Sequence, residues 1–141
     1  MQRLRDIASD ILRTIEHIAR ECEAPIDLLL IADLRKKVAL AHSLFFAQQE
    51  QLVLQPLRQS GDPALAEIAR CSVERDLEGR RMGLAHYQRW PLARVAEDPA
   101  GYRREVLTML RWIEARILYA EQTAYPALAR LISSSKQAAG R

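Results

Sequence analysis

Three histidines and several spaced carboxylates are the residues of this chain whose types could bind a metal ion. His17 and Glu21 stand four residues apart, so a helix would place both side chains on one face, where they could chelate together. His42 and His86 stand alone, each beside apolar residues at helical spacing. Because no second pair accompanies His17 and Glu21, we interpret them as a surface pair. His42 and His86 are interpreted as hydrogen-bonded core residues.

Signatures of the common enzyme classes are missing from the sequence. There is no glycine-rich phosphate loop, no Gly-x-Ser-x-Gly motif and no His-Glu-x-x-His motif. No Glu-x-x-His occurs, which excludes the ligand pattern of ferritin-like di-iron proteins. Most carboxylates alternate with arginines three or four residues away, which is typical of solvent-exposed ion pairs. The sequence therefore predicts a protein that is not an enzyme.

The composition is that of one ordinary globular domain. The 141 residues are 49% hydrophobic and 28% charged, which is enough for a core without disulfides or metals. The net charge of +3 is small, so no nucleic-acid partner is expected. Cys22 and Cys71 lack a CxxC context and are interpreted as buried, reduced thiols. No signal-peptide run and no membrane-length apolar stretch occurs, so we expect a cytoplasmic protein without a membrane partner.

Apolar residues recur at spacings of three and four along four segments, which predicts four long helices. The first three helices are expected over Arg3–Cys22, Pro25–Arg58 and Pro63–Trp90. The fourth follows a polar connection at residues 97–101 and ends near residue 131. Residues 133–141 have no apolar face and predict a flexible tail.

Prolines and glycines mark the points where these helices should begin, bend or pack. Asp62 and Pro63 are predicted as the cap and first residue of the third helix. Pro56 is expected to loosen or kink the last turn of the second helix. Gly79 and Gly83 leave the third helix with a thin apolar face, so either another helix approaches closely there or the helix bends.

The chain also repeats itself at a spacing of 70 residues. The triplet at residues 5–7 (RDI) returns at residues 75–77 (RDL), and Pro56 returns as Pro126. We therefore predict a helical hairpin that occurs twice in the chain, folded as an all-α, antiparallel up-down-up-down four-helix bundle. It would form a single domain over residues 1–132, with hairpins at about 1–60 and 63–132. The alternative is a different helical arrangement formed by dimerisation.

Two phrases at the ends of the second and fourth helices carry a family resemblance. Residues 46–56 (FAQQEQLVLQP) and residues 116–126 (RILYAEQTAYP) each place an acid, then apolar residues, then a proline near a helix end. In a duplicated bundle this resembles the hemerythrin-like (HHE cation-binding) domains. In that family the phrase looks like His-x-x-x-Glu-Glu-x-x-Leu-Phe-Pro, and its histidine and first glutamate bind a di-iron centre, with further histidines from the first and third helices.

The resemblance implies that most metal ligands have been replaced in this chain. The family's ligand positions fall on Phe46 and Glu50 in the second helix and on Arg116 and Ala120 in the fourth. Only Glu50 among them could coordinate a metal. Gln51 and Glu121 fall on the following, non-ligand position, and the expected histidines of the first and third helices are replaced by the Arg-Asp pairs at residues 5–6 and 75–76. Arg116 would place a fixed positive charge where cations sit in the family.

We therefore expect a small bacterial hemerythrin-like bundle that has lost its iron and works as a non-enzymatic regulatory or protein-binding module. Its partner would be another protein or a second copy of the chain. One alternative is a small-molecule or nucleic-acid binder. The other is a metal- or oxygen-sensing bundle that binds iron through a non-standard ligand set. That set would be drawn from His42, Glu50, Asp6, Asp76 and His86.

Overall fold

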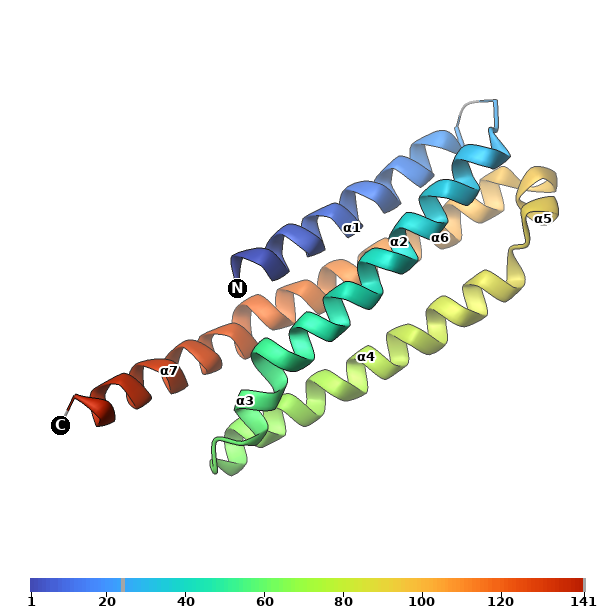
Figure 1. The fold of residues 1–141 in the computed structure, drawn as a ribbon. Helices are drawn as coiled ribbons and strands as arrows, with labels where there is room; N and C mark the ends of the chain where they lie inside the picture. Colours follow the sequence, from blue (N-terminus) through green and yellow to red (C-terminus); the bar gives the residue numbers. More distant parts are fainter. Residues whose placement is uncertain (24, 141) are drawn as a thin grey trace.

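The chain is all-α and folds into five continuous helical runs that pack against each other, as seen in a computed structural model (Figure 1). The structure describes residues 1–23 and 25–140, and these contain no β-strand. Two of the runs each include a π-helical turn, named η1 and η2. The elements are α1 (Gln2–Glu21), α2 (Leu28–Gln49), η1 (Glu50–Leu54), α3 (Gln55–Arg58), α4 (Pro63–Arg89), α5 (Leu92–Glu97), α6 (Pro99–Tyr119), η2 (Ala120–Ala124) and α7 (Tyr125–Ala139).

Consecutive long helices run in opposite directions along the molecule (Figure 1). α1 packs against both α2 and α6, and α4 packs against α6 and against the two π-helical turns. The short helix α5 turns the chain at the end where α4 stops and α6 begins. The predicted all-helical architecture is therefore confirmed, with one short helix that the sequence did not indicate.

Aspartate caps set the starts of three helices. Asp27 accepts a hydrogen bond from the Leu30 N–H at 3.1 Å, so α2 begins after Asp27 and not at Pro25 as expected. Asp62 caps α4 as predicted. Asp98 accepts from the Gly101 N–H at 2.9 Å, so α6 already begins inside the connection that we expected at residues 97–101.

Two of the helical runs pass through a π-helical turn just before a proline. The Gln55 N–H bonds to the Glu50 carbonyl, five residues back, and the equivalent bond in η2 ends on Ala120. Proline has no N–H, and its ring crowds the carbonyl four residues earlier, so the wider turn makes room for Pro56 and Pro126. The helix therefore continues past Pro56 through a widened turn, where we had expected a loosened or kinked end.

The C-terminal run is longer than the sequence indicated. Residues 133–139, which we assigned to a flexible tail, belong to α7 and are exposed. Their helical state follows from continuity with the packed first turns of α7, where Tyr125, Ala127 and Leu128 are buried. Residue 141 of the expected tail and residue 24 of the first break lie outside the described residues.

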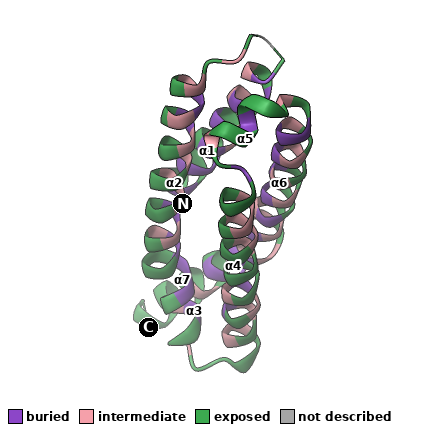
Figure 2. Cartoon of the chain, turned by 90° about the vertical axis from the view of Figure 1, so that its right-hand side faces the viewer, coloured by how far each residue is buried: buried purple, intermediate pink, exposed green. Residues whose placement is uncertain are grey.

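The core is built from the apolar stripes predicted for the long helices (Figure 2). α1 contributes the most regular stripe, with Leu4, Ile11, Ile15 and Ile18 almost fully buried. The wide apolar arc of α2 is only partly covered, because Leu40 is 68% exposed. We had expected this arc to be buried between two neighbours or to form an oligomer surface. The structure covers one side of it and leaves the other side on the surface.

The two glycines of α4 have different structural roles. A Cβ atom added at Gly79 would overlap the ring of Trp112 from α6, whereas a Cβ at Gly83 would meet nothing within 4 Å. Of the two alternatives that the glycines indicated, a close helix approach or a bend, the close approach is found at Gly79. It also places Trp112 at a boundary between helices of the same chain.

This difference predicts opposite effects of the same substitution at the two positions. Gly79→Ala should lower the free energy of unfolding by about 1 to 3 kcal/mol, because Trp112 must move. Gly83→Ala should raise it by up to about 1 kcal/mol, because alanine favours helix and finds open space. Urea unfolding followed by circular dichroism measures both, and a shift of both variants in the same direction would contradict the packing described here.

Candidate functional site

A buried charged cluster joins three helices near the middle of the molecule. Asp76 on α4 accepts a hydrogen bond from the Arg116 Nε of α6 at 2.7 Å and from the Gln49 Nε2 of α2 at 2.7 Å. All three residues are buried, with exposed fractions of 8%, 7% and 2% respectively. Arg116 therefore lies in the core, as its place in the family phrase implies, and it is paired with a carboxylate.

Asp76 and Arg116 form an ion pair that is buried away from solvent. Burial raises the pKa of Asp76, and the charge and hydrogen bond of Arg116 and the hydrogen bond of Gln49 oppose this rise. Arg80 is a second positive charge that acts on Asp76. Two cations thus act on one buried anion.

Arg116 is only partly satisfied by this arrangement. Its two terminal nitrogens, Nη1 and Nη2, are buried and find no hydrogen-bond partner among the described residues. Since the Nε edge of the planar guanidinium is bound to Asp76, the terminal pair is left for another partner. Buried charged donors without a partner are rare in proteins and mark a site that needs an explanation.

A hollow of about 310 Å³ opens between α2 and α4, over α1 and α6. Its polar members are Arg35, His42, His86, Tyr87 and Tyr102. The remaining wall is almost entirely apolar and includes Ile15, Ile18, Val38, Val106, Met109 and Ile113. A concave, mainly apolar site with a few polar groups is the usual form of a small-molecule binding site.

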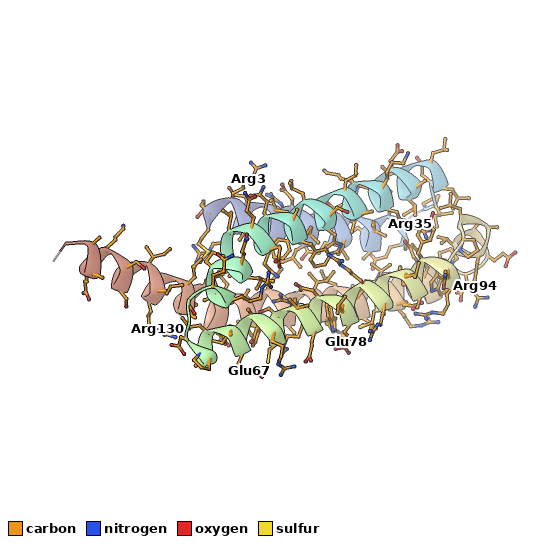
Figure 3. The ribbon with its side chains drawn as sticks, turned by 60° about the horizontal axis from the view of Figure 1, so that its bottom comes forward. Arg3, Arg35, Glu67, Glu78, Arg94 and Arg130 are labelled. Atoms are coloured by element: carbon orange, nitrogen blue, oxygen red, sulfur yellow. The ribbon has the colours of Figure 1, made fainter. Side chains whose placement is uncertain are left out.

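Arg35 stands at the α5 end of this hollow, between α2 and α4 (Figure 3). Its guanidinium donates to the Trp90 carbonyl at 2.8 Å and lies over the Tyr87 ring at 4.6 Å from its centre. Arg35 thereby ties α2 to α4 at one end of the hollow. Glu67 and Glu78 lie on the outer side of α4 and point away from it (Figure 3).

The two histidines of the hollow are held as neutral imidazoles. Burial, with the charges of Arg35 and Arg89, lowers the pKa of His86 to about 4. The nearest carboxylate, Glu105, lies 3.7 Å from His86 Nδ1 but is already paired with Arg89 and with the Trp90 indole. Burial also lowers the pKa of His42.

Stacking with aromatic neighbours fixes the positions of these two rings. His86 stacks on Tyr102 with ring centres 5.5 Å apart, and His42 stacks on Phe46 at 5.8 Å. Both histidines are thus half-buried against apolar neighbours, as the sequence indicated. The hydrogen bond that we expected for each is absent for His86 Nδ1 among the described residues.

The structure distributes the candidate metal ligands over different places. Asp6 is exposed and accepts from Gln2 at 2.8 Å, and Glu50 is exposed and paired with Arg58. Asp76 is in the buried cluster, while His42 and His86 line the hollow. Nowhere in the described chain do three or more His, Cys, Asp or Glu side chains gather as a metal ion would require.

The remaining pair and the two thiols lie apart from this region. His17 and Glu21 form a surface pair on α1, with a 3.2 Å hydrogen bond, as predicted. Both cysteines are free. Cys22 is buried as expected, whereas Cys71 is half-buried and its sulfur contacts the side chains of Glu67 and Arg70.

Sequence reasoning missed the roles of Gln49 and Arg35. Gln49 follows Phe45 by four residues, so a polar side chain on a buried stripe was the available signal. Arg35 gave no such signal, because its contacts with Tyr87 and Trp90 join residues that are distant in the sequence. The hollow itself depends on the distance between α2 and α4, which periodicity does not encode.

No family model matches the chain, no curated protein matches it, and no solved structure matches it. Over the described residues, every helix is too short or too polar to cross a bilayer. The site must therefore be interpreted from its own chemistry.

The buried cluster predicts a large penalty for removing one partner alone. Asp76→Leu should lower the free energy of unfolding by about 3 to 5 kcal/mol, because Arg116 is left buried and unpaired. Adding Arg116→Leu should recover most of that loss. The matched control is Asp6→Leu, one repeat earlier and exposed, with an expected effect within about 0.5 kcal/mol. Chemical denaturation measures these variants together with the single variant Arg116→Leu, and a double variant that loses as much stability as its two singles added together would refute the pairing.

The lowered pKa of His86 predicts that acid destabilises the fold. The unfolded imidazole takes up a proton below its ordinary pKa of 6.5, whereas the folded one resists protonation down to about pH 4. The stability contribution is therefore present above pH 6.5 and lost as the pH falls. Between pH 7.5 and pH 5 we expect a loss of about 2 kcal/mol from His86.

The variant His86→Phe keeps the ring stacked on Tyr102 and removes the titrating group. Its free energy of unfolding should vary less with pH than that of the unmodified protein. Some variation with pH should remain, because burial also lowers the pKa of His42. Urea titrations at several pH values give, for each protein, the slope of the free energy of unfolding against pH. Equal slopes for the two proteins would show that His86 is protonated as easily in the folded state as in the unfolded one.

Proposed function

We propose that this chain is a non-enzymatic regulatory binding module, built as a hemerythrin-like antiparallel four-helix bundle from which the metal centre has been lost. The opposite directions of consecutive long helices support this architecture. So does the repetition of a π-helical turn before a proline, 70 residues apart in the two halves. The resemblance in the two phrases at residues 46–56 and 116–126 links the bundle to that family.

The observation that carries the proposal is the ion pair of Arg116 with Asp76. In the related phrase, the position of Arg116 belongs to a metal-binding histidine, and here a permanent cation occupies it. Arginine is not deprotonated in proteins, so a metal ion beside it would be repelled at short range. Asp76, one of the few carboxylates able to serve as a ligand in the core, is already engaged by Arg116 and Gln49.

The hollow between α2 and α4 is the proposed binding site of this module. It is comparable in size with the smallest natural ligand sites, which begin at roughly 300 Å³. Leu40 and Leu44 on α2 and Leu84 and Tyr87 on α4 are exposed apolar residues, and Tyr87 also lines the hollow. Exposed apolar residues on both helices support a protein partner or a second copy of the chain.

The alternative, iron binding or oxygen sensing through an unusual ligand set, has less support. Its five candidate residues are divided among the surface, the buried cluster and the hollow. His42 lines a small hollow with Asp76 and an open one with Glu50, but no three of the five gather as a metal ion would require among the described residues. His42 and His86 share the large hollow. Both are neutral at pH 7, which suits a ligand, but no carboxylate from the candidate set lines that cavity with them.

Metal content separates the two proposals. Protein purified from iron-replete cells should contain far less than one iron per chain by elemental analysis, because Arg116 occupies the core position. His42→Gln is the matched control, since it removes one candidate ligand and should leave the metal content at the same background. Near two iron atoms per chain, with loss of metal in His42→Gln, would overturn the metal-free module and establish the alternative.

A further inference from the structure

The lining of the large hollow between α2 and α4 carries one positive charge. Among the described residues, Arg35 is its only arginine, and no lysine, aspartate or glutamate lines it. The two histidines of the lining, His42 and His86, are neutral at pH 7 because burial lowers both pKa values. The hollow therefore presents a cation without a counter-ion of its own.

The guanidinium of Arg35 is held in place but only partly bonded. Its Nη1 donates to the Trp90 carbonyl at 2.8 Å, and its central carbon lies 4.6 Å from the centre of the Tyr87 ring and 5.8 Å from that of Tyr102. Its Nε and Nη2 atoms find no partner among the described residues. Arg35 is half-buried, and these two atoms remain accessible, unlike the sealed terminal nitrogens of Arg116.

This free pair of donors is an edge of the guanidinium that suits a carboxylate. The N–H groups of Nε and Nη2 are parallel in the planar group, so they match the two oxygens of one carboxylate. The chain already contains such a pair, because Arg5 binds Glu121 through Nε at 2.7 Å and through Nη2 at 3.0 Å. The bond to Trp90 orders Arg35 in advance, which reduces the entropy lost when a ligand binds.

The hollow offers space for an apolar body next to this edge. Arg35 and His42 are seven residues apart on α2, which corresponds to about 10 Å along the helix. The volume of about 310 Å³ is about twice that of the engineered cavity, roughly 150 Å³, that holds one benzene molecule. A body of about two fused rings fits this space. The apolar residues around it are Ile15, Ile18, Val38, Val106, Met109 and Ile113.

We propose that the large hollow binds a small carboxylic acid, with its carboxylate on the Nε and Nη2 atoms of Arg35 and its apolar, ring-sized body between α2 and α4. A neutral ligand leaves Arg35 without a counter-ion, and a cationic ligand is repelled by it. This inference rests on the proposed function, because it takes the hollow as the binding site of the module and specifies the chemistry of what binds there.

Two probes with the same bicyclic body and different polar groups test the inference. Isothermal titration calorimetry at pH 7.5 measures naphthylacetate, which is ionised at this pH, and naphthylethanol, which is neutral. The acid should bind at least tenfold more tightly than the alcohol, since charge-assisted bidentate bonds exceed a neutral hydrogen bond. Equal binding of the two probes would overturn the carboxylate assignment.

A methionine of the lining reports where the acid binds. Met109 lines the hollow, whereas Met1 precedes α1 at the end away from Ile15 and Ile18. In protein labelled at the methionine methyl groups, the NMR signal of Met109 should shift when naphthylacetate is added. The signal of Met1 is the internal control. Binding that leaves the Met109 signal unchanged would place the acid elsewhere and overturn the inference.

Variants at two arginines separate Arg35 from the general charge of the protein. Arg35→Gln removes the charge and should reduce the acid to the affinity of the alcohol. Arg35→Lys keeps the charge without the paired donors, so it should retain a smaller preference, and it decides the matter if Arg35→Gln does not fold. The matched control is Arg80→Gln, because Arg80 also lies over a ring, 4.5 Å from the centre of Phe46, but does not line this hollow. An equal loss of preference in Arg35→Gln and Arg80→Gln would overturn the role of Arg35.

The outcomes also separate this inference from the proposed function. If both probes bind equally and the Met109 signal shifts, the hollow is a binding site and the carboxylate assignment is wrong. If neither probe binds, the assignment fails and so does the hollow as the site of the module. The metal-free core is judged independently by the iron content of the unmodified protein.

Discussion

The buried pair of Arg116 and Asp76 is the constraint on which the rest of this molecule depends. Two charges removed from water must compensate each other almost completely, so the helices that carry them are fixed in depth and rotation. Gln49 adds a donor from α2 to the same carboxylate, and the cluster thereby joins α2, α4 and α6 at one level. An apolar cluster at this level would hold the helices together with less positional specificity. The charged cluster requires one register of α4 against α6.

The two halves of the chain share a backbone plan but differ at this level. Both have a π-helical turn before a proline, and both place an aspartate at the corresponding point of the preceding helix. Asp6 is exposed, whereas Asp76 is buried, because the residue 70 positions before Arg116 is Phe46, which offers no counter-charge. The two halves therefore differ in their interior at this level, and the buried polar cluster is made by two residues of the second half and by Gln49 of the first.

The sequence predicted those features that depend on local spacing. The apolar stripe of α1 follows from helical periodicity, and the cap at Asp62 follows from the chemistry of helix starts. Both are found in the structure. The glycines of α4 indicated a close approach, but only the structure assigns it to Gly79 and the ring of Trp112. The π-helical turns were not predicted, because a proline inside a helix is compatible with a kink, an end or a widened turn. The helical state of residues 133–139 was also missed, since an exposed helix that extends a packed one needs no apolar face of its own.

The candidate site was less predictable because it is made by distances between helices. Periodicity identifies which face of a helix is apolar, but it does not show how far apart two apolar faces stand. The Trp112 ring packs against Gly79, where there is no side chain, and holds α4 close to α6. Arg35 of α2 binds the Trp90 carbonyl at the end of α4. Between these two contacts, Gly83 presents no side chain toward the hollow. The hollow is therefore a consequence of two long-range contacts and one missing side chain, a combination that no single stretch of the sequence displays.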